Sequence, residues 1–127
     1  MAEPEATSLL CGKIRLRLTL GKDTVALGPG KADLLDAVRS SGSVSAAAKA
    51  MGMSYRRAWL LVETMNSCFT MPLVKCVRGG SGGGGAEVTA EGVAVLQLFR
   101  CMQAEVDSVV ERYLPYFSAG TRGTLEK

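Results

Sequence analysis

Hydrophobic and polar residues alternate along the segment from Lys13 to Leu20. Every second residue from Ile14 onward is aliphatic, and the residues between them are basic or threonine. A period of two places alternate side chains on opposite faces of a strand. We therefore predict a half-buried strand here, followed by a turn and a short return strand over residues 25–27.

The spacing then changes to that of helices. Pro29 suits a first helical turn, because its backbone angle is preset and its missing amide is not needed there. Aliphatic residues between 34 and 38 mark the buried side of this helix, and Gly42 suits its left-handed end. Ser43 then caps a short alanine-rich helix that closes at Gly52. The small side chains of this helix would let a neighbouring helix approach closely.

A further helix begins after Ser54 and extends to about Phe69, ahead of Pro72. Arginine and aromatic residues crowd its first turns, on the side opposite its apolar stripe. The core face of this helix is predicted to consist of Ala58, Val62, Met65 and Phe69.

β-prone residues at 73–77 and 86–88 flank a stretch dominated by glycine, which predicts a hairpin with a glycine-rich tip. Helix, tight turn, helix and hairpin follow in the order of a winged helix-turn-helix. In that fold the second helix enters the major groove of DNA and the hairpin lies along the backbone. The predicted fold class is therefore mainly α with small β (α+β), with an N-terminal strand and a long C-terminal helix.

Positive charge is concentrated on this candidate DNA-reading region. Residues 49–80 hold five basic residues against the single acid Glu63, a net of +4 in a chain whose total is +3. Helix N-termini favour phosphate, and arginine reaches guanine edges or the DNA backbone. For Trp59 a groove contact and packing against the hairpin are equally compatible with the sequence. The predicted DNA-binding residues are Ser43, Ser54, Tyr55, Arg56, Arg57, Trp59, Lys75, Arg78, Gly79 and Gly80.

Composition narrows the classes of function. With 127 residues, 47% of them hydrophobic and 21% charged, the chain is expected to form one folded domain. The absence of histidine excludes Ser-His-Asp and Cys-His catalysis and histidine metal ligation. The four cysteines form no close pair, so we expect reduced thiols and no metal site. No signal peptide or membrane-spanning run is recognisable, which predicts a cytoplasmic protein without a membrane partner.

Six glycines within residues 79–85 allow other interpretations. A dinucleotide-binding loop would need a strand directly before it, a helix directly after it and an acid about twenty residues on. That context is missing, and no Gly-Lys-Ser/Thr follows. We therefore expect no cofactor and no enzymatic activity.

The C-terminal helix is predicted over residues 89–114, capped by Thr89 and stopped by Pro115. Its apolar residues step alternately by four and three, which favours a seam against a partner helix from a second copy of the chain. The alternative is that the stripe packs only on its own domain. The expected boundaries are a flexible N-terminus over 1–11, the winged domain over 12–117 and a disordered tail over 118–127. The predicted dimerisation residues are Val95, Phe99, Met102, Val106, Val109 and Tyr113.

Several of these motifs together resemble a known family. The chain is similar, over about residues 13–115, to the N-terminal DNA-binding domain of the ModE family of molybdate-responsive transcriptional regulators, and more widely to LysR-type winged helices. The Ser-Tyr-Arg-Arg-Ala-Trp string and the downstream polyglycine hairpin are its most specific features. The residues that carry the resemblance are Gly42–Ala48, Gly52–Trp59, Glu63–Asn66, Arg78–Ala86 and Val88-Thr89.

The resemblance implies a recognition helix over 54–66, a wing over 74–89 and a bacterial homodimer that binds double-stranded DNA. Molybdate-sensing members carry further C-terminal oxyanion-binding modules, so no molybdate binding is expected within this chain. Two other functions remain open at this point. One is a protein-interaction or dimerisation module on a winged scaffold without specific DNA readout, and the other is a small nucleotide-binding enzyme that uses the glycine loop.

Overall fold

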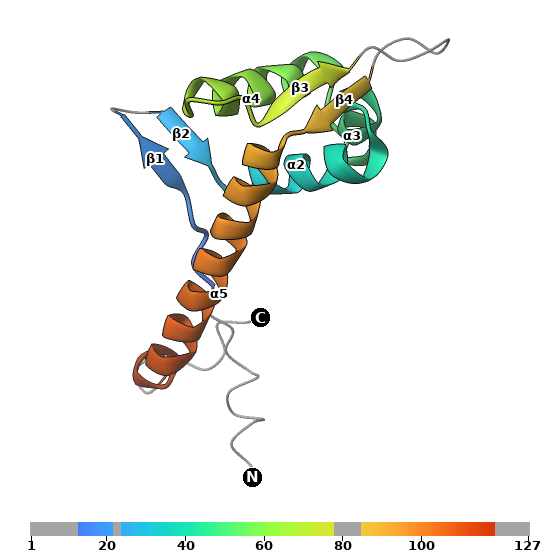
Figure 1. The fold of residues 1–127 in the computed structure, drawn as a ribbon. Helices are drawn as coiled ribbons and strands as arrows, with labels where there is room; N and C mark the ends of the chain where they lie inside the picture. The colour runs from blue at the N-terminus through green and yellow to red at the C-terminus, as the bar shows by residue number, and fades with distance from the viewer. Residues whose placement is uncertain (1–12, 22–23, 78–84, 119–127) are drawn as a thin grey trace. The chain divides into compact units, whose positions relative to one another are not determined.

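The computed structural model describes residues 13–21, 24–77 and 85–118. The chain divides into two compact units, one formed by Leu16–Arg100 and one formed by residues from 1–15 and 101–127. The fold is mainly α with small antiparallel β, as predicted, and the order of its elements is winged-helix-like (Figure 1). The elements in chain order are β1 (Leu18–Leu20), β2 (Thr24–Leu27), α2 (Pro29–Ser41), α3 (Val44–Ala50), α4 (Tyr55–Ser67), β3 (Val74–Val77), β4 (Gly85–Val88) and α5 (Ala90–Ser118).

The N-terminal strand is shorter than its alternating pattern predicts. β1 and β2 pair antiparallel from Leu18 opposite Leu27 to Leu20 opposite Thr24, with a register shift next to Leu18. Residues 13–17 have no regular structure. The chain enters α2 two residues after Leu27, so β2 offers no backbone to pair with them. The alternation of apolar and polar residues predicts which side chains share a face of this segment. The length of the partner strand β2 determines how many of its residues pair in the sheet.

Helix ends lie where the capping residues predicted them. Gly42 adopts φ 77° at the end of α2, and its amide donates to the carbonyl of Val38. The hydroxyl of Ser43 accepts a hydrogen bond from the amide of Ala46 at 2.8 Å at the start of α3. α4 ends at Ser67, slightly before the predicted end near Phe69.

The core of the unit Leu16–Arg100 lies among α2, α3 and α4, with β2 beside α4 and β4 beside α2. The three predicted core residues within α4 are fully buried, whereas Phe69, which lies beyond the end of the helix, is half-buried. The large side chains with the least exposure are Phe99, Leu27, Leu34, Leu35, Met65, Leu73, Leu96, Val38, Val62 and Val74.

The predicted hairpin is present as β3 and β4. They pair antiparallel with Val74 opposite Val88 and Val77 opposite Gly85. The amide of Ala86 donates to the carbonyl of Gly42 at 2.9 Å, which joins the hairpin to the end of α2. A Cβ on Gly85 would stand 2.8 Å from that same carbonyl oxygen, so this approach requires glycine.

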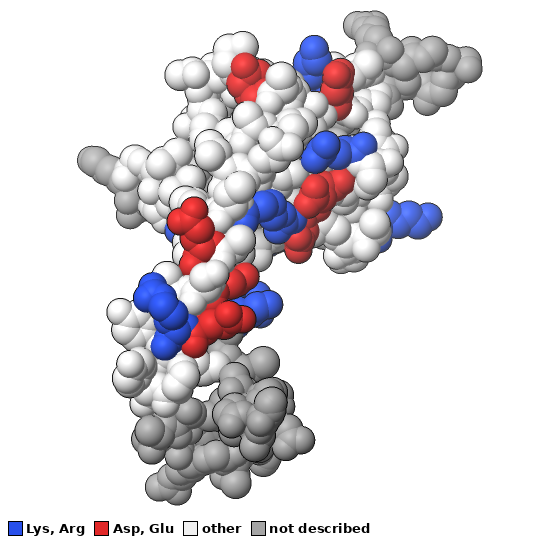
Figure 2. All heavy atoms as spheres, turned by 60° about the horizontal axis from the view of Figure 1, so that its bottom comes forward, with Lys and Arg blue, Asp and Glu red and all other residues white. Residues whose placement is uncertain are grey.

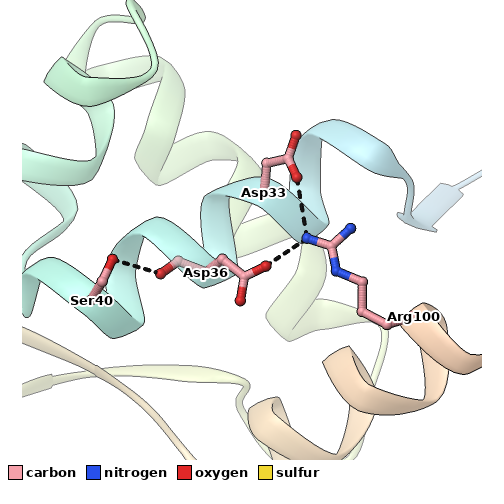
Figure 3. Close-up of polar contacts among 4 residues, drawn as sticks. All are labelled: Asp33, Asp36, Ser40 and Arg100. Atoms are coloured by element: carbon pink, nitrogen blue, oxygen red, sulfur yellow. Dashed lines mark hydrogen bonds and ion pairs between the residues drawn. The ribbon is translucent and has the colours of Figure 1, made fainter.

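α5 differs from its predicted end. The helix passes through Pro115 and continues to Ser118. Proline removes one amide donor and crowds the carbonyl four residues before it, which weakens or kinks a helix without always ending it. Within the first half of α5, Arg100 reaches α2 and donates to Asp33 at 3.2 Å and to Asp36 at 2.5 Å (Figure 3).

Candidate nucleic-acid interface

α3 and α4 form a close pair joined by a tight turn. Gly52 adopts φ 69° in that turn, and the amide of Met53 donates to the carbonyl of Ala48 at 3.0 Å. Ala47 and Ala48 on α3 and Ala58 on α4 are all buried. Side chains this small let the two helices approach closely, so the turn presents the first residues of α4 on the surface.

The first turn of α4 is positively charged and exposed. The hydroxyl of Ser54 accepts a hydrogen bond from the amide of Arg57 at 3.0 Å, which fixes the start of the helix. Tyr55 is 57% exposed, and Arg56 and Arg57 are also exposed. No acidic residue lies in this turn, and no ion pair engages either arginine within residues 13–21, 24–77 and 85–118. The cationic groups are therefore available to an external anion.

Trp59 packs on the protein. It is half-buried, lies against the hydrophobic core, and meets the ring of Tyr55 edge-on with centroids 6.4 Å apart. The sequence left a groove contact and packing against the hairpin equally open, and the structure packs part of the ring against the hydrophobic core. A DNA contact through its exposed part stays a prediction.

The wing contributes less positive charge than its lysine suggested. Lys75 is exposed on β3, but its cross-strand partner on β4 is Glu87. Opposite charges facing each other across an antiparallel pair offset one another. The predicted contacts Arg78, Gly79 and Gly80 lie outside the described residues.

Charge elsewhere on the molecule is mixed. On the face drawn in Figure 2, basic and acidic side chains lie next to one another and no single sign dominates. Arg17 and Lys31 line a surface cavity together with Arg57. The sequence did not predict a functional role for either Arg17 or Lys31. Arg17 looked like the polar face of a strand and Lys31 like an ordinary helical surface residue, so the linear sequence carried no signal for this cluster.

Asn66, near the end of α4, was not predicted to have a functional or structural role of its own. Its side chain bonds the backbone of both Leu73 and Val74, and thereby ties α4 to the wing. An asparagine at a helix end is common enough that the sequence could not assign it this role.

The predicted dimer seam divides into buried and exposed parts. Phe99 is only 2% exposed and belongs to the core of its own chain, so we correct its assignment from dimer contact to core residue. The heptad spacing placed it on the seam, but α5 turns the same face toward the core near Leu96. Farther along, Met102 is 39% exposed, Val109 40% and Tyr113 52%. Val95 and Val106 are half-buried.

Other chemistry has little support within the described part of the chain. Cys68, Cys76 and Cys101 form no disulfide among the described residues, and Cys11 lies outside them. No cluster of three or more cysteine or acidic residues suited to a metal is found among residues 13–21, 24–77 and 85–118. In the same ranges no helix combines the length and hydropathy that crossing a membrane would require.

Known proteins similar to this chain are regulators and molybdenum-related proteins. The molybdenum transport protein ModE of Azotobacter vinelandii is 33% identical over 111 residues, which cover 87% of this chain and 41% of that protein. The molybdenum-pterin-binding protein MopB of Rhodobacter capsulatus is 31% identical over 80% of this chain and 38% of its own length. The DNA-binding transcriptional dual regulator ModE of Escherichia coli K12 is 41% identical over 71 residues, or 56% of this chain and 27% of the regulator.

These similarities establish a relation to proteins named ModE and Mop over part of their length. The chain spans about two fifths of the first two of these relatives. No family model matches the chain.

Proposed function

We propose that this chain is a ModE-like transcriptional regulator that binds double-stranded DNA in a sequence-specific manner. The observation that carries this proposal is the first turn of α4, where Tyr55, Arg56 and Arg57 are exposed around a capped helix start with no acidic neighbour in the turn. The relation to proteins named as transcriptional regulators supports the same conclusion.

The first turn of α4 provides two kinds of contact. A helix N-terminus carries partial positive charge, which favours a phosphate, and arginine can bond a guanine edge with two parallel hydrogen bonds. The amide of Arg57 donates to the hydroxyl of the N-cap residue Ser54, so the side chain of Arg57 projects from the first turn of α4. We assign a backbone phosphate to Arg57 and a base edge to Arg56. Ser43, Lys75 and the wing tip would add contacts to phosphate.

The proposed regulator acts as a homodimer through α5. Met102, Val109 and Tyr113 expose an apolar stripe along the part of the helix that follows Arg100. Exposed apolar residues at heptad spacing are stabilised by a second helix. A two-fold dimer would place two α4 helices on half-sites about one helical turn of DNA apart.

A protein-interaction module on the same scaffold is the alternative. The exposed cationic turn without an acidic neighbour favours DNA binding over such a module, because phosphate contacts need unpaired Lys or Arg side chains. The two functions differ in their salt dependence, because phosphate contacts release counterions and weaken steeply as salt rises.

Selection of bound fragments from a random pool of DNA duplexes by the purified full chain tests the proposal. We expect enrichment of a two-fold symmetric motif, and loss of enrichment for the double variant Arg56→Ala, Arg57→Ala. Arg39→Ala, at the exposed end of α2, removes one positive charge outside the interface and should retain the motif. If the wild-type chain enriches no motif at low salt, sequence-specific DNA binding is wrong.

A further inference from the structure

A cavity of about 290 Å³ lies among the β1–β2 hairpin, the start of α2 and the first half of α4. All of its lining residues belong to the unit Leu16–Arg100. Three of them are cations: Arg17 ahead of β1, Lys31 in the first turn of α2, and Arg57 in the first turn of α4. No acidic residue is among the described residues that line this cavity.

The three cations come from separate parts of the chain, so only the fold brings them together. The ammonium group of Lys31 donates to the carbonyl of Val25 at 2.6 Å, which holds it at the cavity wall. No ion pair within 13–21, 24–77 and 85–118 involves any of the three. The positive charge of the cavity is therefore not balanced by the protein.

The cations also influence one another. Burial lowers the pKa of Lys31, the positive charges of Arg17 and Arg57 lower it further, and Cys68 acts in the opposite direction. Like charges held close together cost stability, and an anion placed among the three side chains would offset that cost by attracting each of them.

The rest of the wall fits a small anion. Gly28 and Gly30 bring backbone close to the cavity, and Gly28, the N-cap residue, has no side chain that could cap the first turn of α2. Amides of a first helical turn add to the preference for negative charge. The volume is at or below the lower end of the range of about 300–1,000 Å³ that drug-sized ligands occupy, so a single phosphate-sized group fits better than a nucleotide.

We propose that this cavity binds a tetrahedral oxyanion of the phosphate class through Arg17, Lys31 and Arg57. The anion has two possible sources, a free ion in solution or one backbone phosphate of bound DNA. Arg57 joins the cavity to the first turn of α4, so either occupant would contact the helix that we assign to DNA. Only the second source depends on the proposed function.

The first experiment uses the DNA-free full chain and inorganic phosphate, with sulfate and molybdate as further tetrahedral dianions, at constant ionic strength. We expect saturable shifts of the amide resonances of Gly30, Lys31 and Arg57. The double variant Arg17→Gln, Lys31→Gln should bind roughly a hundredfold more weakly, because it loses two charge-assisted contacts. Arg39→Gln, which removes an exposed cation at the far end of α2, should bind like the wild type.

The second experiment identifies the source with a pool of random DNA duplexes. If a backbone phosphate occupies the cavity, DNA displaces inorganic phosphate, and the double variant reduces the salt slope of DNA binding by about one or two. If the source is a free ion, phosphate shifts persist with DNA bound and the slope is unchanged. Failure to bind any DNA would overturn the proposed function while leaving the phosphate titration readable. The anion site is overturned if no dianion binds more tightly than about 10 mM and the DNA salt slope is also unchanged, or if the double variant binds phosphate like the wild type.

Discussion

The side chain of Asn66 bonds both backbone polar groups of Val74. Its Nδ2 donates to the carbonyl of Val74 at 3.0 Å, and its Oδ1 accepts from the amide of Val74 at 3.2 Å and from that of Leu73 at 2.7 Å. Leu73 and Val74 are buried, so these backbone groups have little access to water. One amide thus joins α4 to the first strand of the wing and sets their relative position.

Replacement of Asn66 by alanine should lower the free energy of unfolding by about 1–3 kcal/mol, because it leaves buried backbone groups without partners. DNA affinity should fall further than the loss of folded protein explains, since the wing is no longer held to α4. Chemical denaturation and DNA titration of the same samples separate the two effects. Ser67→Ala, which removes only an exposed bond to Thr64, is the control and should change neither quantity.

Gly92 and Gly30 should respond oppositely to alanine. Glycine to alanine within a helix gains up to about 1 kcal/mol from helix propensity. At Gly92, however, the added Cβ would lie 2.6 Å from a methyl carbon of Val88 and also within the contact distance of the carbonyl oxygen of Leu73. We expect a net loss of about 1–3 kcal/mol for Gly92→Ala.

A Cβ at Gly30 would have no neighbour within 4 Å, so Gly30→Ala should raise stability by about 0.4–1 kcal/mol. Thermal unfolding of both variants measures the contrast. An equal effect of the two substitutions would contradict the close packing of Gly92 against Leu73 and Val88.

Charge on the exposed seam of α5 should prevent dimerisation. The double variant Met102→Glu, Val109→Glu places two carboxylates in the proposed interface, where an unpaired charge is costly to bury. Sedimentation should show monomers, with unchanged helix content. Ala104→Glu, Ser108→Glu alters exposed residues on the other side of the same helix and should leave the dimer intact. Phe99 is unsuited to this test because its substitution would unfold the core.

Arg56→Ala and Arg57→Ala should weaken DNA binding in different ways. If Arg56 contacts a guanine, its loss should cost about 1–3 kcal/mol and relax preference at one position of the operator. If Arg57 contacts phosphate, its loss should weaken binding uniformly and lower the salt slope by about one. Both are exposed and away from the core face, so stability should hardly change. Wild-type affinity and slope in both variants would rule out α4 as the reading helix.

Lys31 should make stability rise with pH in the alkaline range. Burial lowers the pKa of Lys31 from its ordinary value of 10.5, so the folded chain releases this proton at a lower pH than the unfolded chain. Between the two pKa values the unfolded state binds more protons, and the free energy of unfolding therefore increases with pH. Below that window both states are protonated and this gain is absent.

The measurement is the difference in unfolding free energy between wild type and Lys31→Gln, followed from about pH 8 toward the ordinary lysine pKa near 10.4. It should become more favourable to the wild type as pH rises. Lys49→Gln, which removes an exposed lysine on α3, corrects for the general effect of losing a lysine. A difference that stays flat or falls contradicts the assigned environment of Lys31.

The sequence by itself determined the elements and most of their ends. Ser43, Ser54 and Gly42 act on backbone groups within a few residues of themselves, so their roles follow from local chemistry. The buried stripe Ala58, Val62 and Met65 follows from helical periodicity in the same way. The hairpin also formed where β-prone segments flanked glycine.

Tertiary structure decided the features that depend on contacts between different elements of the fold. The length of β2 limited the length of β1. The packing of α5 placed Phe99 in the core, although later residues of the same heptad stripe, such as Met102 and Val109, are exposed. The cavity shared by Arg17, Lys31 and Arg57 joins residues up to forty positions apart, and the bonds of Asn66 cross from a helix to a strand. Periodicity and capping specify a face or an end of one element, whereas contact between elements depends on how all of them pack together.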